Sequence, residues 1–292
     1  MELRRYHSAV SDNARWQGFV PRAGDVFVCT PAKCGTTWMQ SIVASLLWPT
    51  SEPPGPVLAI SPWIEMQIMP AAEVHAQLAA QDHRRFMKSH TPADGIPWFD
   101  EARYVFVARD GRDAFMSLCN HVEHLQDALR DTLNAQAPEG VPQLPAWDGD
   151  LHAFYERWLG DDELFFRHVA TFWGARHRSN LLLVHYSDLK ADLAGEMRRV
   201  AAFLGAEVPE ASWPEVVARC TFERMRDGEA RMGKVDMIFK GGLKSFVFKG
   251  TNGRWRDVLT EAELAAYARR VAEAVPPECA AWLERGRGAL SG

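Results

Sequence analysis

One junction between an apolar run and a short polar segment constrains this chain most. The run Asp25-Val26-Phe27-Val28-Cys29-Thr30 is typical of a buried strand, and after Pro31 comes Lys33-Cys34-Gly35-Thr36-Thr37-Trp38-Met39-Gln40, which is typical of a tight loop that opens a helix. Gly35 allows a sharp turn, and the free N–H groups at a helix start suit an anion. Because Lys33 adds a positive charge, we predict a phosphate-binding loop here.

This loop differs from the phosphate loop of ATP-binding proteins. In that motif, Lys directly follows the last glycine, and the next Ser or Thr binds magnesium. Here Thr36 follows Gly35, and Lys33 lies two residues before the glycine. The sequence therefore favours a phosphate ester over a magnesium-bound triphosphate.

The length and the net charge of the chain limit which classes of protein it can belong to. With 292 residues, of which 47% are hydrophobic and 24% charged, residues 1–292 are expected to form a single α/β domain. The net charge of -5 and the isoelectric point near 6.1 argue against a nucleic-acid partner or a membrane-surface protein. An anion site must therefore be a local concentration of Lys and Arg.

The cysteines and the start of the sequence predict the compartment. The five cysteines are odd in number and lack the paired spacing of a metal site, so we expect a reduced intracellular protein without a metal. The start Met1-Glu2-Leu3-Arg4-Arg5 has no apolar signal core, and no run of about twenty apolar residues follows. These features predict a soluble, cytoplasmic protein with no membrane insertion.

Predicted strands and helices alternate along the chain. The predicted strands are 25–30, 85–90, 103–108 and 180–186, and the predicted helices after the first are 73–80, 114–125, 151–177, 189–204 and a closing surface helix at 261–273. This alternation indicates a central parallel sheet flanked by helices, with ligands beyond the carboxyl ends of the strands. Lys33, His90, Arg109 and Tyr186 all fall there. Residues 134–150 are rich in Pro and Gly and predict a flexible lid or insertion.

Four segments in chain order resemble the cytosolic sulfotransferases, over roughly Trp16 to Tyr267. They are Pro31-Ala32-Lys33-Cys34-Gly35-Thr36-Thr37-Trp38, Lys88-Ser89-His90, the pair Arg109 and Ser117, and Phe248-Lys249-Gly250-Thr251-Asn252-Gly253-Arg254-Trp255. The resemblance implies transfer of a sulfuryl group from 3′-phosphoadenosine 5′-phosphosulfate (PAPS) to a hydroxyl or amine of a small or lipid-like acceptor. The product would be adenosine 3′,5′-bisphosphate (PAP), and no metal would take part.

The resemblance also implies roles for individual residues. His90 would be the general base, Lys33 and Lys88 would stabilise the transferring group, and Trp63, Met66 and His90 would contact the acceptor. The implied donor-binding residues are Lys33, Cys34, Gly35, Thr36, Thr37, Trp38, Arg109, Ser117, Tyr186, Cys220, Phe222, Phe248, Lys249 and Gly250.

These roles agree with the chemistry, because sulfuryl transfer needs a base for the acceptor proton and cations for the developing charge. A histidine such as His90 can titrate near neutrality. Taken without the resemblance, the same residues have ordinary explanations. His90 would be a surface or capping residue, the two lysines would be solvated, residues 109–113 would form a surface ion-pair cluster, and the aromatic residues would belong to the core.

Three residues depart from the family pattern. Cys34 replaces a serine, Cys220 a threonine near adenine, and Phe248 an arginine that helps to hold the 3′-phosphate, so donor affinity is in question. We expect Lys249 and the Gly250 backbone to carry that contact, with Lys244 as compensation. We also expect a lowered pKa and a reactive thiolate at Cys34, beside Lys33 and a helix N-terminus, provided that the thiol is accessible.

The family's short dimerisation motif is also incomplete. Glu261 follows Thr260 where valine is usual, and Ala265 stands where glutamate is usual. The sequence therefore leaves the oligomeric state open.

Three other functions fit parts of the sequence. A small-molecule or nucleotide kinase shares the strand-loop-helix phosphate site, but it would need a Lys-Ser or Lys-Thr pair closing the loop, which is missing. A non-catalytic nucleotide-binding module would not need His90 or the two lysines. The spacing from Cys220 to Arg226 matches thiolate phosphate-ester hydrolases, but that segment has no glycine and places Glu223 where the anion would sit.

Overall fold

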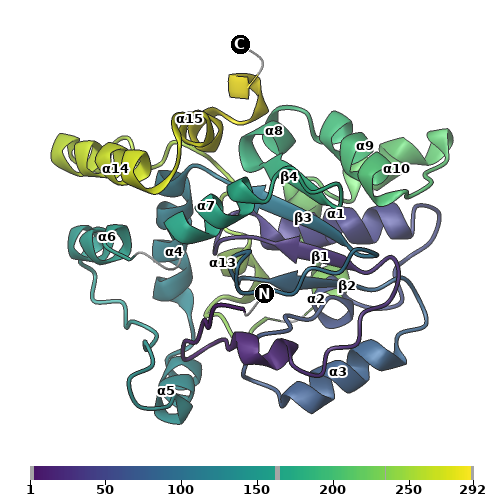
Figure 1. Cartoon of the computed structure of the whole chain (residues 1–292), viewed down its shortest axis with the longest axis horizontal. Coiled ribbons are helices and arrows are strands. Elements are labelled where there is room, and N and C mark those ends of the chain that lie inside the picture. Colours follow the sequence, from purple (N-terminus) through teal and green to yellow (C-terminus); the bar gives the residue numbers. More distant parts are fainter. Residues whose placement is uncertain (1–2, 162–164, 234, 291–292) are drawn as a thin grey trace.

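The computed structural model describes residues 3–161, 165–233 and 235–290, and within them four strands form one parallel sheet (Figure 1). The strand order is β2-β1-β3-β4, with bounds β1 Val26–Cys29, β2 Phe86–Ser89, β3 Arg103–Ala108 and β4 Leu181–His185. In the register, Cys29 pairs with Ser89 and with Phe106. The predicted parallel sheet is confirmed, and its carboxyl ends bring distant segments to one edge.

Helices cover both faces of the sheet, so the strands are mainly apolar, with polar residues at some of their ends. Val26 and Val28 of β1 pack into one core cluster, whereas Phe27 and Cys29 pack into the other. The first cluster is closed by α1 Thr36–Leu47, α9 Leu193–Leu204 and α10 Trp213–Ala218. The second is closed by α4 Gly111–His124, α6 Leu151–Leu159, α7 Arg167–Gly174, α14 Glu261–Ala274 and α15 Pro277–Arg285.

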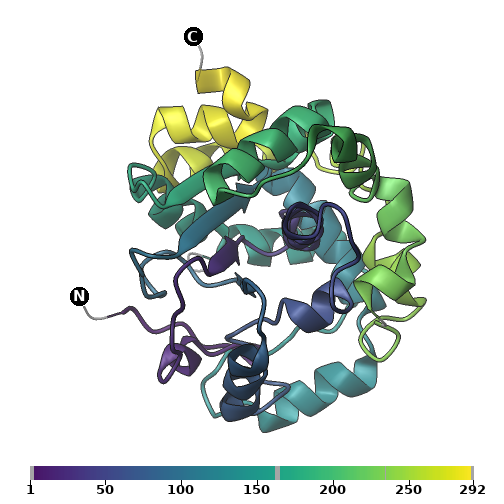
Figure 2. The same ribbon diagram turned by 90° about the vertical axis from the view of Figure 1, so that its right-hand side faces the viewer.

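Shorter helices complete the fold. The side view shows the C-terminal helices gathered at one end of the molecule and α3 at the opposite end (Figure 2). The remaining helices are α2 Val57–Ile60, α3 Ala71–Ala80, α5 Asp127–Gln136, α8 Tyr186–Ala191, α11 Phe222–Arg226, α12 Glu229–Met232 and α13 Gly242–Phe246, with short 3-10 turns at Asn13–Trp16, Glu210–Ser212 and Arg287–Leu290. Among the described residues, no helix combines the length and apolar character that a membrane crossing requires.

Two predicted helices are divided. The predicted helix 151–177 consists of α6, which ends before Gly160, and α7, while residues 162–164 lie outside the described part of the chain. The predicted helix 189–204 is divided at Asp192, whose side chain accepts a hydrogen bond from the Gly195 N–H and caps α9. Local capping therefore overrides the continuous apolar pattern at this position.

Two further predictions need correction. The loop predicted at 134–150 begins at 137, because its first three residues form the end of α5. The helix at 261–273 does not close the fold. The helix α15 follows it and buries Cys279, Trp282 and Leu283 in the core.

A buried ion pair joins the starts of β1 and β2. Arg85 donates from Nε to Asp25 Oδ1 at 2.9 Å and from Nη2 to Asp25 Oδ2 at 2.5 Å. The two residues are only 3% and 1% exposed. Arg85 also donates to the carbonyl oxygens of Val20 and Leu78, so its charge is fully engaged at the edge of the sheet opposite the predicted site.

Replacing Arg85 by Met should leave the Asp25 carboxylate buried without its cation, which typically costs about 3 to 5 kcal/mol of unfolding free energy. Urea unfolding followed by circular dichroism measures this loss. The matched control is Arg198→Met, which breaks the exposed Arg198–Glu210 pair and should change stability much less. Equal effects of the two variants would contradict a special role for the buried pair.

Candidate active site

The predicted phosphate-binding loop has the backbone of an anion nest. Lys33 has φ 68° and Gly35 has φ 101°, so the chain turns through left-handed conformations directly before α1. A Cβ on Gly35 would lie 2.9 Å from Tyr186 Cδ2, so the position requires glycine for space as well as for conformation. No side chain caps α1, and its first N–H groups therefore remain available to a ligand.

The Lys33 ammonium lies among aromatic rings and other cations. Its Nζ is 3.1 Å from Nδ1 of His121 and 5.4 Å from the ring centre of Phe246. Burial, followed by the charges of Lys88 and Arg109, lowers the pKa of Lys33 to about 8. Within the described ranges no carboxylate pairs with Lys33, so its charge is available to a bound anion.

Trp63, Lys88 and His90 form a second group beside this loop. The segment at 62–64 runs along β2, since Lys88 N–H donates to the Pro62 carbonyl at 3.0 Å and Ile64 N–H donates to the Lys88 carbonyl at 3.4 Å. The Lys88 Nζ lies 5.3 Å from the Trp63 ring centre, and burial lowers the pKa of Lys88 to about 8. The Trp63 ring also stands edge-on to His90, with centroids 4.8 Å apart.

His90 is held as a neutral imidazole. Its Nδ1 lies 2.8 Å from the Thr30 carbonyl oxygen, which can only accept, so Nδ1 carries the proton and Nε2 keeps its lone pair. Burial, followed by the charge of Lys88, lowers the pKa of His90 to about 3. The expectation of titration near neutrality is therefore wrong for this state of the protein, because the desolvated ring beside two ammonium groups resists protonation.

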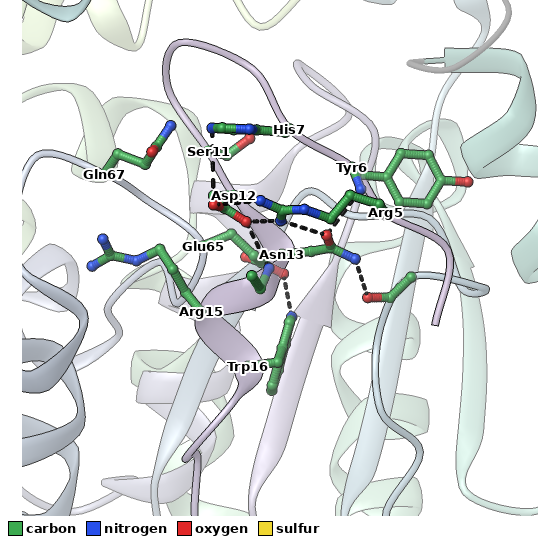
Figure 3. Close-up of polar contacts among 12 residues, drawn as sticks. Arg5, Tyr6, His7, Ser11, Asp12, Asn13, Arg15, Trp16, Glu65 and Gln67 are labelled. Atoms are coloured by element: carbon green, nitrogen blue, oxygen red, sulfur yellow. Dashed lines mark hydrogen bonds and ion pairs between the residues drawn. The ribbon is translucent and has the colours of Figure 1, made fainter. Parts of the chain in front are cut away.

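A buried carboxylate that the sequence did not reveal as important fixes the strand end that carries Lys88 and His90. Glu65 Oε1 accepts a hydrogen bond from Trp16 Nε1 at 2.8 Å (Figure 3). It also accepts one from Ser89 Oγ at 2.5 Å, and burial raises the pKa of Glu65. Ser89 lies between Lys88 and His90, so Glu65 fixes the strand end that carries both. Met66 follows Glu65 and is bridged to Ser11 of the N-terminal segment. The signal in the sequence was an isolated Glu in an otherwise apolar segment.

The residues expected around adenine gather on the other side of the loop. The rings of Trp38 and Tyr186 meet edge to face at 5.1 Å, and Trp38 Nε1 donates to the Cys220 carbonyl at 2.8 Å. Phe222 lies against the C-terminal loop, since a Cβ on Gly250 would approach its Cδ2 to 2.7 Å. The structure therefore brings together residues that are almost two hundred positions apart.

Arg109 joins this aromatic group to the C-terminal loop. Its guanidinium lies 4.1 Å from the Tyr186 ring centre, and its Nη2 donates to the Thr251 carbonyl at 2.9 Å and to Asn252 Oδ1 at 2.8 Å. Ser117 lies half-buried on α4, two turns after Arg109. The neighbouring Phe248 and Lys249 contact each other, with Lys249 Nζ 5.1 Å from the Phe248 ring centre.

Both cysteines at this site are buried thiols. Burial raises the pKa of Cys34 to about 12, in spite of the nearby positive charges of Arg109 and Lys33. The expected reactive thiolate at Cys34 is therefore wrong, since desolvation outweighs attraction. Burial also raises the pKa of Cys220 to about 12, and its Sγ donates to Ser45 Oγ in the core. This geometry disfavours the thiolate hydrolase alternative.

A family model described as a sulfotransferase domain matches residues 23–277. The chain belongs to the sulfotransferase family. A glycolipid sulfotransferase of Mycobacterium tuberculosis (strain ATCC 25618 / H37Rv) is 33% identical to this chain, over 97% of this chain and 94% of the relative. Human sulfotransferase 1C2 is 26% identical over 87% and 84% of the two chains. The expectation of a PAPS-dependent sulfotransferase is thereby confirmed.

Solved structures share the fold of this sulfotransferase. A mouse sulfotransferase complexed with PAP gives a TM-score of 0.68 at 19% identity, covering 89% of this chain and 88% of that chain. A retinol dehydratase in complex with retinol and PAP also gives a TM-score of 0.68, at 20% identity, covering 91% and 87%. These likenesses support the α/β architecture.

The lowered pKa of Lys33 predicts how anion binding depends on pH. Below about 8 the ammonium is already charged, whereas above it each bound anion must draw in a proton. Affinity for PAP should therefore fall with rising pH, by about tenfold per pH unit for each proton taken up. Calorimetry in two buffers of different ionisation enthalpy measures this proton uptake.

The control is Lys33→Arg, whose guanidinium stays charged in this range. This variant should retain only the part of the pH dependence that comes from Lys88. Equal affinity of the unaltered protein at pH 7 and pH 10 would contradict the assignment.

Proposed function

We propose that this chain transfers the sulfuryl group of PAPS to a hydroxyl, or less favourably an amine, of a lipid-like acceptor, in one domain and without a metal. The observation that carries the proposal is the convergence of Lys33, Lys88 and the Nε2 lone pair of His90 at one sheet edge. The site holds acid-base and anion-binding groups together, and PAPS supplies the activated sulfuryl group.

His90 acts as the general base in this proposal. Its Nε2 removes the acceptor proton while the acceptor oxygen forms a bond to sulfur and the bond from sulfur to the phosphate oxygen breaks. Lys33 stabilises the charge that develops on the departing phosphate, and Lys88 the charge on the sulfuryl oxygens. The negative charge of the donor also compensates the two lysines, which favours the protonated imidazole that forms at His90.

The donor lies along the residues gathered around the loop. The 5′-phosphosulfate binds in the nest from Lys33 to Thr37. Adenine lies among Trp38, Tyr186 and Phe222, and the Cys220 backbone fixes Trp38. The 3′-phosphate binds to Arg109 and Ser117. Arg109 has a buried Nε without a hydrogen-bond partner in the described structure, as expected for a group that awaits an anion. Lys249 and the Gly250 backbone complete this side.

Two considerations favour an apolar acceptor. The mycobacterial relative at 33% identity is named for a glycolipid, and retinol accompanies PAP in one structural neighbour. In this chain the lysine and histidine groups lie against the rings of Trp63, Phe239 and Phe246. Trp63 and Met66 form one wall of the acceptor pocket in this proposal.

The free state of all five cysteines supports a cytoplasmic location.

The donor proposal predicts tight binding of PAP in the presence of a chelator, because the loop lacks the Lys-Ser pair that holds magnesium. Calorimetry with PAP and with ATP, each with and without magnesium, measures this preference. A kinase would show magnesium-dependent binding of ATP and no binding of PAP, and that result would overturn the proposal. An acceptor screen with sulfur-labelled PAPS then identifies the acceptor class.

Replacing His90 by Ala should lower turnover by about 10² to 10⁴, because general-base catalysis typically contributes that much. Affinity for PAP should change little, since His90 is assigned to the acceptor proton. The matched control is His177→Ala, an exposed histidine after α7, which should leave turnover unchanged. Near-full turnover of His90→Ala with a saturating acceptor would reassign His90 to structure.

A further inference from the structure

Two cations contact the ring of Phe248, the residue that stands where a phosphate-binding arginine is usual. The Arg254 guanidinium lies 5.2 Å from the ring centre, and Lys249 Nζ lies 5.1 Å from it. Arg254 is half-buried, whereas Lys249 is exposed. The side chain at 254 therefore packs against the residue that stands in place of the arginine.

Arg254 also lies near Arg109, and the charges repel. Burial and then the charge of Arg109 lower the pKa of Arg254. Two guanidinium groups placed together in this way gain from an anion between them. Arg109 is only 5% exposed, and its Nε is buried without a hydrogen-bond partner in the described part of the chain. That unpartnered buried donor is a second, independent observation that points to an anionic ligand.

The backbone of the C-terminal loop holds Arg254 in this position against the repulsion. Gly253 N–H donates to Asp113 Oδ1 at 2.7 Å, one residue before Arg254. Arg109 itself binds the Thr251 carbonyl and the Asn252 side chain. Both ends of the short segment before Arg254 are thus anchored to α4 and its approach. The backbone position from which the Arg254 side chain extends is therefore fixed by the fold.

We propose that Arg254 replaces the arginine missing at Phe248, and that the 3′-phosphate of the donor binds between Arg109 and Arg254. This inference rests on the proposed function. It differs from the expectation for Lys244, which is exposed on the short helix α13. Phe248 then acts as a positioning residue, because its ring supports the Arg254 guanidinium.

The first test compares two nucleotides that differ only in the 3′-phosphate. Arg254→Ala should weaken PAP binding by about 10- to 100-fold, the usual loss for a charge-assisted hydrogen bond, and should change adenosine 5′-phosphate binding less than about threefold. The matched control is Arg256→Ala, an exposed arginine two residues further on in the same loop, which should leave both affinities unchanged. Retained binding of adenosine 5′-phosphate shows that each variant is folded.

The second test moves the charge back to position 248. Phe248→Arg alone should not tighten PAP binding, because a third guanidinium would repel Arg109 and Arg254 and remove the supporting ring. In the Arg254→Ala background the same replacement should restore at least part of the lost PAP affinity. This non-additivity distinguishes a shared phosphate site from separate structural effects.

The outcomes distinguish a failure of the proposed function from a failure of the assignment of Arg254. If the unaltered protein does not prefer PAP to adenosine 5′-phosphate, the proposed function fails. If it does prefer PAP but Arg254→Ala keeps that preference, only the assignment of Arg254 is overturned. A loss of both nucleotides in Arg254→Ala, with no rescue by Phe248→Arg, would likewise overturn it and make Arg254 a structural residue.

Discussion

A concentration of positive charge at the carboxyl edge of the sheet governs this protein. The chain as a whole carries a net charge of -5, yet Lys33, Lys88, Arg109 and Arg254 meet at one edge. Burial lowers the pKa of both lysines to about 8, and at Lys33 repulsion from Lys88 and Arg109 adds to this effect. An anion with several charges relieves this repulsion. The fold itself brings the cations together, so the site needs little rearrangement to bind such an anion.

The rest of the fold holds those charges together. Parallel strands place Thr30, His90, Arg109 and Tyr186 at the same edge, and helices on both faces exclude water from beneath them. The Asp25–Arg85 pair fixes the opposite end of β1 and β2, while Glu65 fixes the end of β2 through Ser89. Stability and function are thus divided between the two ends of the same strands.

Protonation of His90 is coupled to the charges at this edge of the sheet. His90 stays neutral because burial, and then the charges of Lys88 and Lys33, lower its pKa more than the hydrogen bond to the Thr30 carbonyl raises it. In the proposed reaction, the donor that fills the anion site also makes protonation of His90 easier. One electrostatic field therefore links donor binding to the basicity of the group assigned to the acceptor.

The local pattern of the sequence was sufficient to predict the four strands, the loop at Lys33 and the parallel architecture, because strand and turn preferences depend on near neighbours. It was insufficient where capping divided long apolar patterns, as at Asp192, and it missed Glu65 and the contact of His121 with Lys33. The spacing of the sequence also gave no sign that Arg254 lies close to Arg109.

The sequence by itself determined the strand-loop-helix junction and the residue types that the sulfotransferase family requires, since both are written in consecutive residues. Only the tertiary structure decided the protonation of His90, the raised pKa of the Cys34 thiol and the partners of Arg109. These properties depend on burial and on charges contributed by segments far away in the chain. Desolvation and Coulomb energy act through space, so they arise only when the fold brings those segments together.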